Sequence, residues 1–297
     1  MNSCPEGWLE KRKGWIVMLE TIATKAVEQN EAVLTDLAKK IWDCPETAFN
    51  EVKACEWTAQ VLRDAGFQVE VGCANLPTAI RATWGKGHPV IGFLGEYDAL
   101  PGLSQKVSTE KEPVTPGAAG QGCGHHLLGV ACVGSALCMK AELEATGKEG
   151  TVVFYGCPAE EVLTGKAFMA SEGAFTELDV AFSWHGSSSN NLSVGTMTGL
   201  NSAIFHFTGV TAHAGGDPHN GRSALDACEL MSVGANYLRE HVTSDVRIHY
   251  VYKEGGTAPN IVPDKASVWY YVRAMSRQAI EDTYARLVKV AEGAAHL

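Results

Sequence analysis

Hydrophobic residues near the start of the chain recur with helical spacing, and further along they gather into short runs. Residues 15–41 and 51–65 carry apolar side chains three and four positions apart, which predicts two helices. The segment DCPE at 43–46 ends the first of them, because proline cannot continue a helix. Three strand-like runs follow, FQVEVGC, PTAIRATW and PVIGFLGEYDAL, and the last is too apolar to face water on either side.

A loop rich in Pro, Ser, Thr and Gly at 101–124 precedes a second alternation of helix and strand. Helices are predicted at 126–145 and 166–173, and a strand-like run follows each of them, TVVFYGCP and DVAFSWH. Strands that alternate with helices in this rhythm are typical of a mostly parallel sheet with helices on both faces. We therefore predict an α/β fold for residues 1–199.

A second unit with a different pattern begins near residue 200. The runs SAIFHFTGV, DVRIHYVYKEGG and SVWYYVRA indicate strands, and helices are predicted at 222–240 and 277–295. The order strand, helix, strand, strand, helix is an α+β, ferredoxin-like arrangement without its last strand. We predict a domain at 200–297 that is incomplete, and we interpret the chain as truncated at that end.

The composition narrows the class of protein. A chain of 297 residues that is 45% hydrophobic and 20% charged is neither a disordered tail nor a coiled coil. The formal net charge of −10 argues against nucleic acid or an anionic membrane as the main partner. We find no secretory signal and no apolar stretch that approaches a membrane span. The nine cysteines form no C-x-x-C pair, so we expect reduced thiols and a cytoplasmic location.

Residues that can bind metals gather at the ends of the predicted strands. In open α/β sheets the carboxyl ends of the strands face the ligand crevice, so side chains there can meet although they are far apart in sequence. Four segments qualify: GEYD at 95–98, GCGHH at 122–126, PAEE at 158–161 and SWH at 183–185.

These segments offer a mixed set of sulfur, nitrogen and oxygen donors. Cys123 and His125 flank a glycine that lets both side chains turn toward one point, and a helix beginning near residue 126 should lower the pKa of the thiol. Glu161 and His185 would complete a set suited to zinc or another borderline divalent ion. Glu160 is then free to take a proton from a metal-activated water, which suggests metal-assisted hydrolysis.

Each of these residues also has an ordinary structural explanation. A lone cysteine is more often a small buried hydrophobe, a lone histidine at a strand end is more often a structural hydrogen-bonding residue, and paired glutamates often begin a solvated helix. A thiol nucleophile at Cys123 with His125 as its base would leave the glutamate pair unused. The chain has no P-loop spacing and no G-x-S-x-G elbow. A separate structural explanation would be needed for each of the four segments that carry potential ligands, so together they favour a metal site.

Seven separated motifs resemble those of the metallopeptidase family of aminoacylases, carboxypeptidases and amidohydrolases. From about residue 30 to the end they follow one another in the family's order: GFLGEYDALPGLSQ, GCGHHLLG, FYGCPAEE, GKAFM, SWH, TAHAGGDPHNGRSALDA and APNIVPDKASVWYYVRA. The resemblance implies a zinc-peptidase-like catalytic domain and a smaller lid domain that mediates dimerisation. It implies Cys123, His125, Glu161 and His185 as ligands of two divalent ions, zinc or manganese, with Glu160 as general base and acid.

The resemblance also gives roles to residues of the lid. His213 would polarise the scissile carbonyl in the neighbouring subunit of a dimer, and Asn260 and Arg273 would hold the carbonyl or the free carboxylate of the substrate. A planar guanidinium suits a carboxylate, since it binds both oxygens. Without the resemblance these would be an ordinary loop histidine, a turn asparagine and a partner in a surface salt bridge.

The activity implied is hydrolysis of N-acyl or aroyl amino acids, such as p-aminobenzoyl-glutamate, or of dipeptides, by a homodimer that a second subunit could join. The chain departs from the family pattern in three places. His126 stands where relatives usually have Asn or Asp, no proline follows SWHG, and the family's final histidine ligand would lie beyond residue 297. A non-catalytic fragment that binds metal or dimerises is therefore the alternative, and a metal-storing or redox protein is a weaker one.

Overall fold

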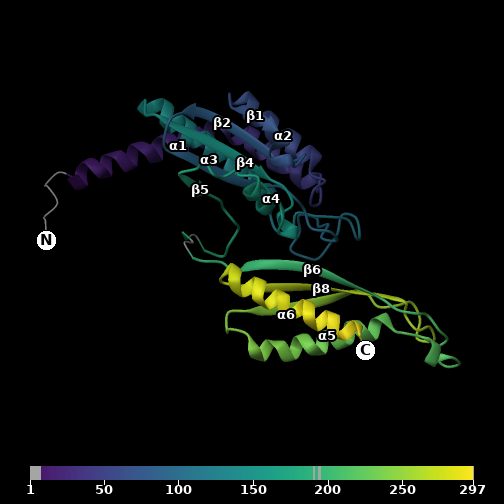
Figure 1. Cartoon of the computed structure of the whole chain (residues 1–297). Coiled ribbons are helices and arrows are strands. Elements are labelled where there is room, and N and C mark those ends of the chain that lie inside the picture. Colours follow the sequence, from purple (N-terminus) through teal and green to yellow (C-terminus); the bar gives the residue numbers. More distant parts are fainter. Residues whose placement is uncertain (1–7, 190, 193–194, 297) are drawn as a thin grey trace, which may run out of the picture. The chain divides into compact units, whose positions relative to one another are not determined.

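The computed structural model describes residues 8–189, 191–192 and 195–296, and the chain divides at residue 190 into two compact units (Figure 1). The division lies close to the boundary predicted at 199. Each unit has a hydrophobic core of its own, and the two are described separately.

The first unit is an α/β structure built from four helices and five strands. Its helices are α1 (Trp8–Asp43), α2 (Val52–Asp64), α3 (His125–Thr146) and α4 (Gly165–Ser171), with short 3-10 turns η1 (Cys73–Asn75) and η2 (Glu160–Val162). Its strands are β1 (Gln68–Val71), β2 (Ile80–Lys86), β3 (Val90–Glu96), β4 (Gly150–Cys157) and β5 (Val180–Phe182).

The five strands form one sheet in the order β1-β2-β4-β3-β5, so β4 lies between two strands that are neighbours in sequence. β3 pairs in parallel with β4 and β5, whereas β2 pairs antiparallel with β1 and β4. The sheet is therefore mixed, where the sequence pattern predicted a mostly parallel one. The three-residue connection at 87–89 is too short for a crossover, so β2 and β3 run in opposite directions on the two sides of β4.

Helices cover both faces of this sheet, as predicted. Along β4, Val152 and Phe154 face α1, α2 and α3, and they belong to the larger core of the unit. Val153 and Tyr155 alternate with them and face the other way, where Met169 of α4 is fully buried. The continuous burial of β4 explains its unbroken apolar sequence.

Helix α3 differs from expectation, because it is long and apolar enough to cross a membrane. Its 18-residue window has a mean hydropathy of 1.3, and 56% of that window is buried inside the unit. The helix packs against α1 and β3, so a core position accounts for the same composition.

The second unit has the predicted α+β, ferredoxin-like order. Two serines cap its helices, since the Ser223 and Ser276 hydroxyls accept hydrogen bonds from the amides of Asp226 and Ala279. Its antiparallel sheet has the order β6-β8-β7, and the helices share a core with one face of it. The elements are β6 (Gly199–Thr208), η3 (Pro218–Asn220), α5 (Ala224–Leu238), η4 (Arg239–His241), β7 (Arg247–Glu254), β8 (Lys265–Ala274) and α6 (Arg277–Ala295).

Candidate metal centre

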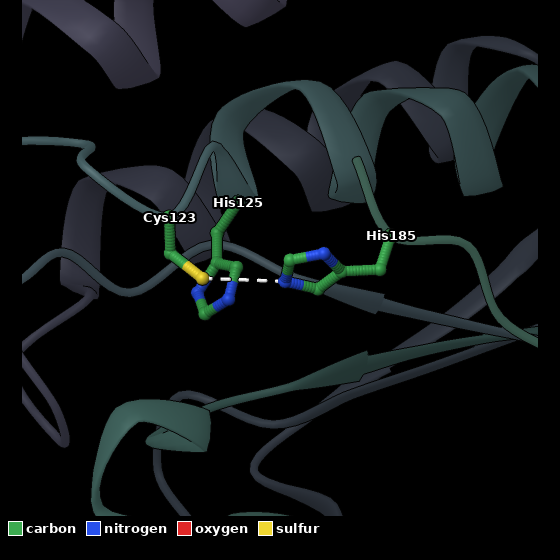
Figure 2. A group of neighbouring side chains, drawn as sticks. All are labelled: Cys123, His125 and His185. Carbon is green, nitrogen blue, oxygen red and sulfur yellow. Dashed lines mark hydrogen bonds between the residues drawn. The ribbon is translucent and has the colours of Figure 1, made fainter. Parts of the chain in front are cut away.

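The start of α3 presents two potential ligands on either side of a bend. Gly124 has a φ of 84°, a left-handed conformation that glycine adopts without steric cost. The bend lets Cys123, before it, and His125, the first residue of the helix, point to the same region (Figure 2). The conformational role expected of this glycine is thus present.

His185, which follows β5, completes a cluster with these two residues. Figure 2 shows its ring facing Cys123, with the Sγ atom 3.2 Å from Nε2. Its other nitrogen, Nδ1, lies 3.0 Å from the carbonyl oxygen of Gly186. One potential donor atom from each of Cys123, His125 and His185 lies within 4.8 Å of the others, so three of the four predicted ligands come together.

The two glutamates lie in η2, directly after β4. Glu160 Oε2 is 3.6 Å from His125 Nε2, and Glu161 Oε1 is 3.8 Å from His125 Nδ1. The turn before them is strained, because Ala159 has a φ of 55°. The buried carboxylate of Glu51 accepts a hydrogen bond from the Ala159 amide at 2.8 Å and so holds that turn.

Asp98 orients the central histidine, a role that the sequence reasoning did not assign. Its Oδ1 lies 3.0 Å and its carbonyl oxygen 3.1 Å from His125 Nδ1. Its Oδ2 accepts a hydrogen bond from the Glu161 amide at 2.9 Å. A carboxylate on one nitrogen of a histidine fixes the ring so that the other nitrogen can bind a metal. In the sequence, the only indication of this role was that Asp98 belongs to the GEYD segment at a predicted strand end.

Three buried atoms at the centre have no hydrogen-bond partner among the described residues: Glu96 Oε2, His125 Nε2 and Glu161 Oε1. Buried polar atoms are rarely left unpaired. All three are potential metal donors, and the half-exposed Cys123 thiol adds sulfur. This mixed donor set fits a zinc-like divalent ion.

The electrostatics of the thiol differ from expectation. Burial and the neighbouring carboxylates of Glu161 and Glu160 raise the pKa of Cys123 to about 11, so the predicted lowering by the helix N-terminus is wrong for the metal-free protein. Burial opposes the charged form of His125, but the hydrogen bond with Asp98 and the charge of Glu96 outweigh it and raise its pKa. The negative charges near Cys123 and His125, those of Glu96, Asp98, Glu160 and Glu161, would thus stabilise a bound cation.

His126 has no place in either group of potential ligands found among the described residues. Its ring lies against Trp42 with centroids 5.0 Å apart, and its amide donates to Gln121 Oε1. Burial and the nearby His125 lower its pKa, which favours a neutral ring. The contacts of His126 with Trp42 and Gln121 fit a structural role beside the centre.

In the second unit, His213 and Asn260 lie on adjacent segments. The Asn260 carbonyl accepts a hydrogen bond from the Ala214 amide, and His213 forms a bridge with Ile261. His213 Nδ1 accepts hydrogen bonds from the amides of Gly215 and Gly216, so in the neutral ring the proton is on Nε2.

Arg273 lies on β8, where its guanidinium carbon is 5.8 Å from the centre of the Tyr271 ring. Its register partners are Leu200 on β6 and Arg247 on β7. No ion pair links Arg273 to a carboxylate within the described part of the chain.

Comparison with known proteins agrees with this chemistry. The chain is 45% identical to one of the subunits of p-aminobenzoyl-glutamate hydrolase from Escherichia coli, over 91% of its own length and 56% of that protein. It is 32% identical to the Xaa-Arg dipeptidase of Mus musculus, over 89% of this chain and 60% of the relative. Residues 196–296 match the M20 peptidase dimerisation domain. The second unit of the chain is thus similar to the dimerisation domain of M20 peptidases.

The structure of the chain also resembles that of a dinuclear metal-binding peptidase of the M20 family from Bacillus subtilis. The TM-score is 0.60 at 18% identity, over 93% of this chain and 71% of the other. At that identity the likeness shows a shared fold. The chain spans 56% and 60% of the length of the two sequence relatives above, which is less than two thirds of each.

Proposed function

We propose that the protein is a metal-dependent amidohydrolase that cleaves N-acyl or aroyl amino acids, such as p-aminobenzoyl-glutamate, or dipeptides. The observation that carries the proposal is the convergence of sulfur, imidazole and carboxylate donors, three of which are buried without a hydrogen-bond partner in the residues that the structure describes. The names of the relatives, an aroyl-glutamate hydrolase and a dipeptidase, support this substrate class.

Cys123, His125, Glu161 and His185 would hold two divalent ions, zinc or manganese, at this centre. The chemistry that such ions supply is Lewis-acid polarisation of a carbonyl and a lowered pKa for water. Asp98 keeps the His125 ring in place from its Nδ1 side, at 3.0 Å. The donors come from several strand ends, so the sheet itself fixes their spacing.

Glu160 would act as the proton carrier of the reaction. Its side chain is 32% exposed, so it can reach both the centre and an entering substrate. It would take a proton from the attacking water and pass it to the departing amine. The Ala159 turn, held by Glu51, keeps this carboxylate at the edge of the centre.

Residues of the second unit would bind the substrate. His213, with its proton on Nε2, would donate a hydrogen bond to the carbonyl oxygen as negative charge develops there. Asn260 would support that carbonyl, and Arg273 would bind the free carboxylate through both oxygens. We propose that the protein forms a homodimer through this unit, in which His213 serves the neighbouring active site.

We further propose a cytoplasmic protein that binds neither nucleic acid nor membranes. The eight cysteines that the structure describes are all free thiols, which suits a reducing compartment. Its acidic charge supports the absence of nucleic-acid partners.

The test is a comparison of turnover and metal content in Glu160→Gln. With p-aminobenzoyl-glutamate and a panel of N-acyl amino acids and dipeptides, we expect kcat to fall by about 10²–10⁴-fold, because the proton carrier is lost. The bound metal, measured by elemental analysis, should be unchanged. Glu172→Gln is the control, since Glu172 contacts Asn75 outside the centre. Wild-type turnover in Glu160→Gln contradicts the assigned base, and a wild-type protein that binds metal but cleaves nothing favours the non-catalytic alternative.

A further inference from the structure

Glu96, the last residue of β3, is a buried carboxylate that faces the centre. It is 5% exposed and occupies the strand end next to Asp98. Its Oε1 accepts a hydrogen bond from the ammonium of Lys166, in the first turn of α4. Its Oε2 has no hydrogen-bond partner within the described part of the chain and lies 3.2 Å from His125 Nε2. One oxygen is therefore held in place and the other is directed toward the histidine.

The two facing atoms, Glu96 Oε2 and His125 Nε2, need a positive charge between them or on one of them. Asp98 accepts the Nδ1 proton of His125, so a neutral ring presents a lone pair at Nε2. Two lone pairs at 3.2 Å repel each other. The two atoms form no hydrogen bond with each other, so a proton on Nε2 does not join them, and a metal cation beside both would supply the positive charge. Zinc binds nitrogen and oxygen ligands at about 2.0–2.2 Å, which places two ligands of one ion about 3–3.5 Å apart.

The carboxylate of Glu160, which keeps its proposed role as proton carrier, lies on the same side of the histidine. Its Oε2 is 3.6 Å from His125 Nε2, and donor atoms of Glu96, His125 and Glu160 all lie within 4.8 Å of one another. The group differs in kind from that of Cys123, His125 and His185, since it offers two carboxylates and no sulfur. Oxygen-rich sites suit harder ions such as Mn²⁺, and thiolate sites suit zinc.

We propose that Glu96 is a further metal-binding residue of this centre, with Oε2 as the donor atom, at a position that favours Mn²⁺ over the softer thiolate position. The inference rests on the proposed function, because it concerns the same metal centre. None of the four predicted ligands comes from the end of β3. Glu96 would add a ligand from that position.

The test is Mn²⁺ binding to the purified, metal-free protein, followed by electron paramagnetic resonance and by elemental analysis. In Glu96→Gln we expect the Mn²⁺ affinity to fall at least about tenfold, since loss of even a supporting residue costs about that much. The stoichiometry at saturating zinc should fall from two ions to one. Glu177→Gln is the matched control, because Glu177 is also a paired carboxylate but contacts Arg81 outside the centre. It should bind as the wild type does.

Two results would overturn the inference. The first is unchanged Mn²⁺ affinity and zinc stoichiometry in a Glu96→Gln variant whose circular dichroism matches the wild type. The second, which needs no variant, is anomalous diffraction from wild-type crystals with manganese that shows no ion within about 2.5 Å of Glu96 Oε2. If the ion lies only among Cys123, His125, Glu161 and His185, the proposed function stands and the inference fails. If the wild type binds no metal, both fail.

Discussion

At the scale of single residues, Cys123 is the group whose chemistry a metal would change most. Burial and the carboxylates of Glu161 and Glu160 raise the pKa of this thiol to about 11. The metal-free thiol is therefore protonated at neutral pH, whereas a metal binds the thiolate. Metal binding must then expel this proton.

This proton makes zinc affinity depend on pH in a definite direction. Below pH 11 the apparent association constant should rise with pH, by up to about tenfold per unit for each proton released. Calorimetry in two buffers of different ionisation enthalpy counts the protons. Cys123→Ala should release one proton fewer and bind zinc more weakly, and Cys44→Ala should match the wild type. Equal proton release from all three proteins would exclude a thiolate ligand.

Sequence alone predicts which residues gather at the centre better than it predicts how they act on one another. The positions of Cys123, His125 and His185 follow from local signals, a glycine bend at the start of a helix and the end of a strand. The roles of Asp98 and Glu96 do not, because both depend on distances to His125 that only the folded chain defines. The same is true of the Cys123 pKa, since the carboxylates that raise it come from η2, more than 30 residues further along the chain.

At the scale of elements, a close approach between α3 and β3 positions the ligands. A Cβ atom at Gly129 would lie 2.2 Å from the backbone oxygen of Glu96, so only glycine permits this contact. The contact sets the distance between the strand end that carries Glu96 and the helix start that carries His125.

Gly129→Ala should therefore destabilise the protein. We expect the free energy of unfolding in urea to fall by about 1–3 kcal/mol, because backbone atoms must move apart. The matched control is Gly293→Ala in α6, where a Cβ meets nothing within 4 Å. That change should be neutral or stabilise by up to about 1 kcal/mol, since alanine favours helix. A stable Gly129→Ala protein would show that α3 can shift without cost.

The ion pair between Arg81 of β2 and Glu177 links the sheet to the segment before β5. The guanidinium donates to both carboxylate oxygens, at 2.7 and 2.8 Å from Nη2. Burial alone would raise the pKa of Glu177, but the Arg81 and Tyr155 hydrogen bonds outweigh it and lower that pKa below 4.5.

A carboxylate with a lowered pKa stabilises the fold above its ordinary pKa and loses that effect as the pH falls through the lowered value. Glu177→Gln should thus cost about 0.5–1 kcal/mol of unfolding free energy at pH 7, a modest amount because the pair is partly exposed. The difference should shrink as the pH drops below 4.5. Urea melts at pH 7 and at pH 3.5 measure it, and a constant difference would contradict the ion-pair explanation.

The elements themselves were largely predictable, while their pairing was not. Helical spacing identified α2, α3, α5 and α6 within a few residues, since each has one apolar face or a buried apolar run. The mixed sheet was not foreseen, because nothing local to β2 or β3 indicates that β4 will lie between them. Strand order depends on contacts that are distant in sequence.

At the scale of the whole molecule, the second unit should determine the oligomeric state. Residues 196–296 match a peptidase dimerisation domain. We expect sedimentation equilibrium to give twice the 31.7 kDa mass of one chain at micromolar concentration. Residues 1–190 expressed alone should sediment as a monomer. A monomeric full chain would contradict the proposed homodimer and with it the role of His213 in a neighbouring active site.

The insertion of β4 between β2 and β3 also constrains how the chain is synthesised. β2 and β3 leave the ribosome one after the other. The strand that pairs with both, β4, begins only at residue 150, after the whole of α3. Until then both expose unpaired backbone edges to the cell, a state prone to aggregation. Slowing translation between residues 96 and 150 should therefore increase the demand of the nascent chain for chaperones.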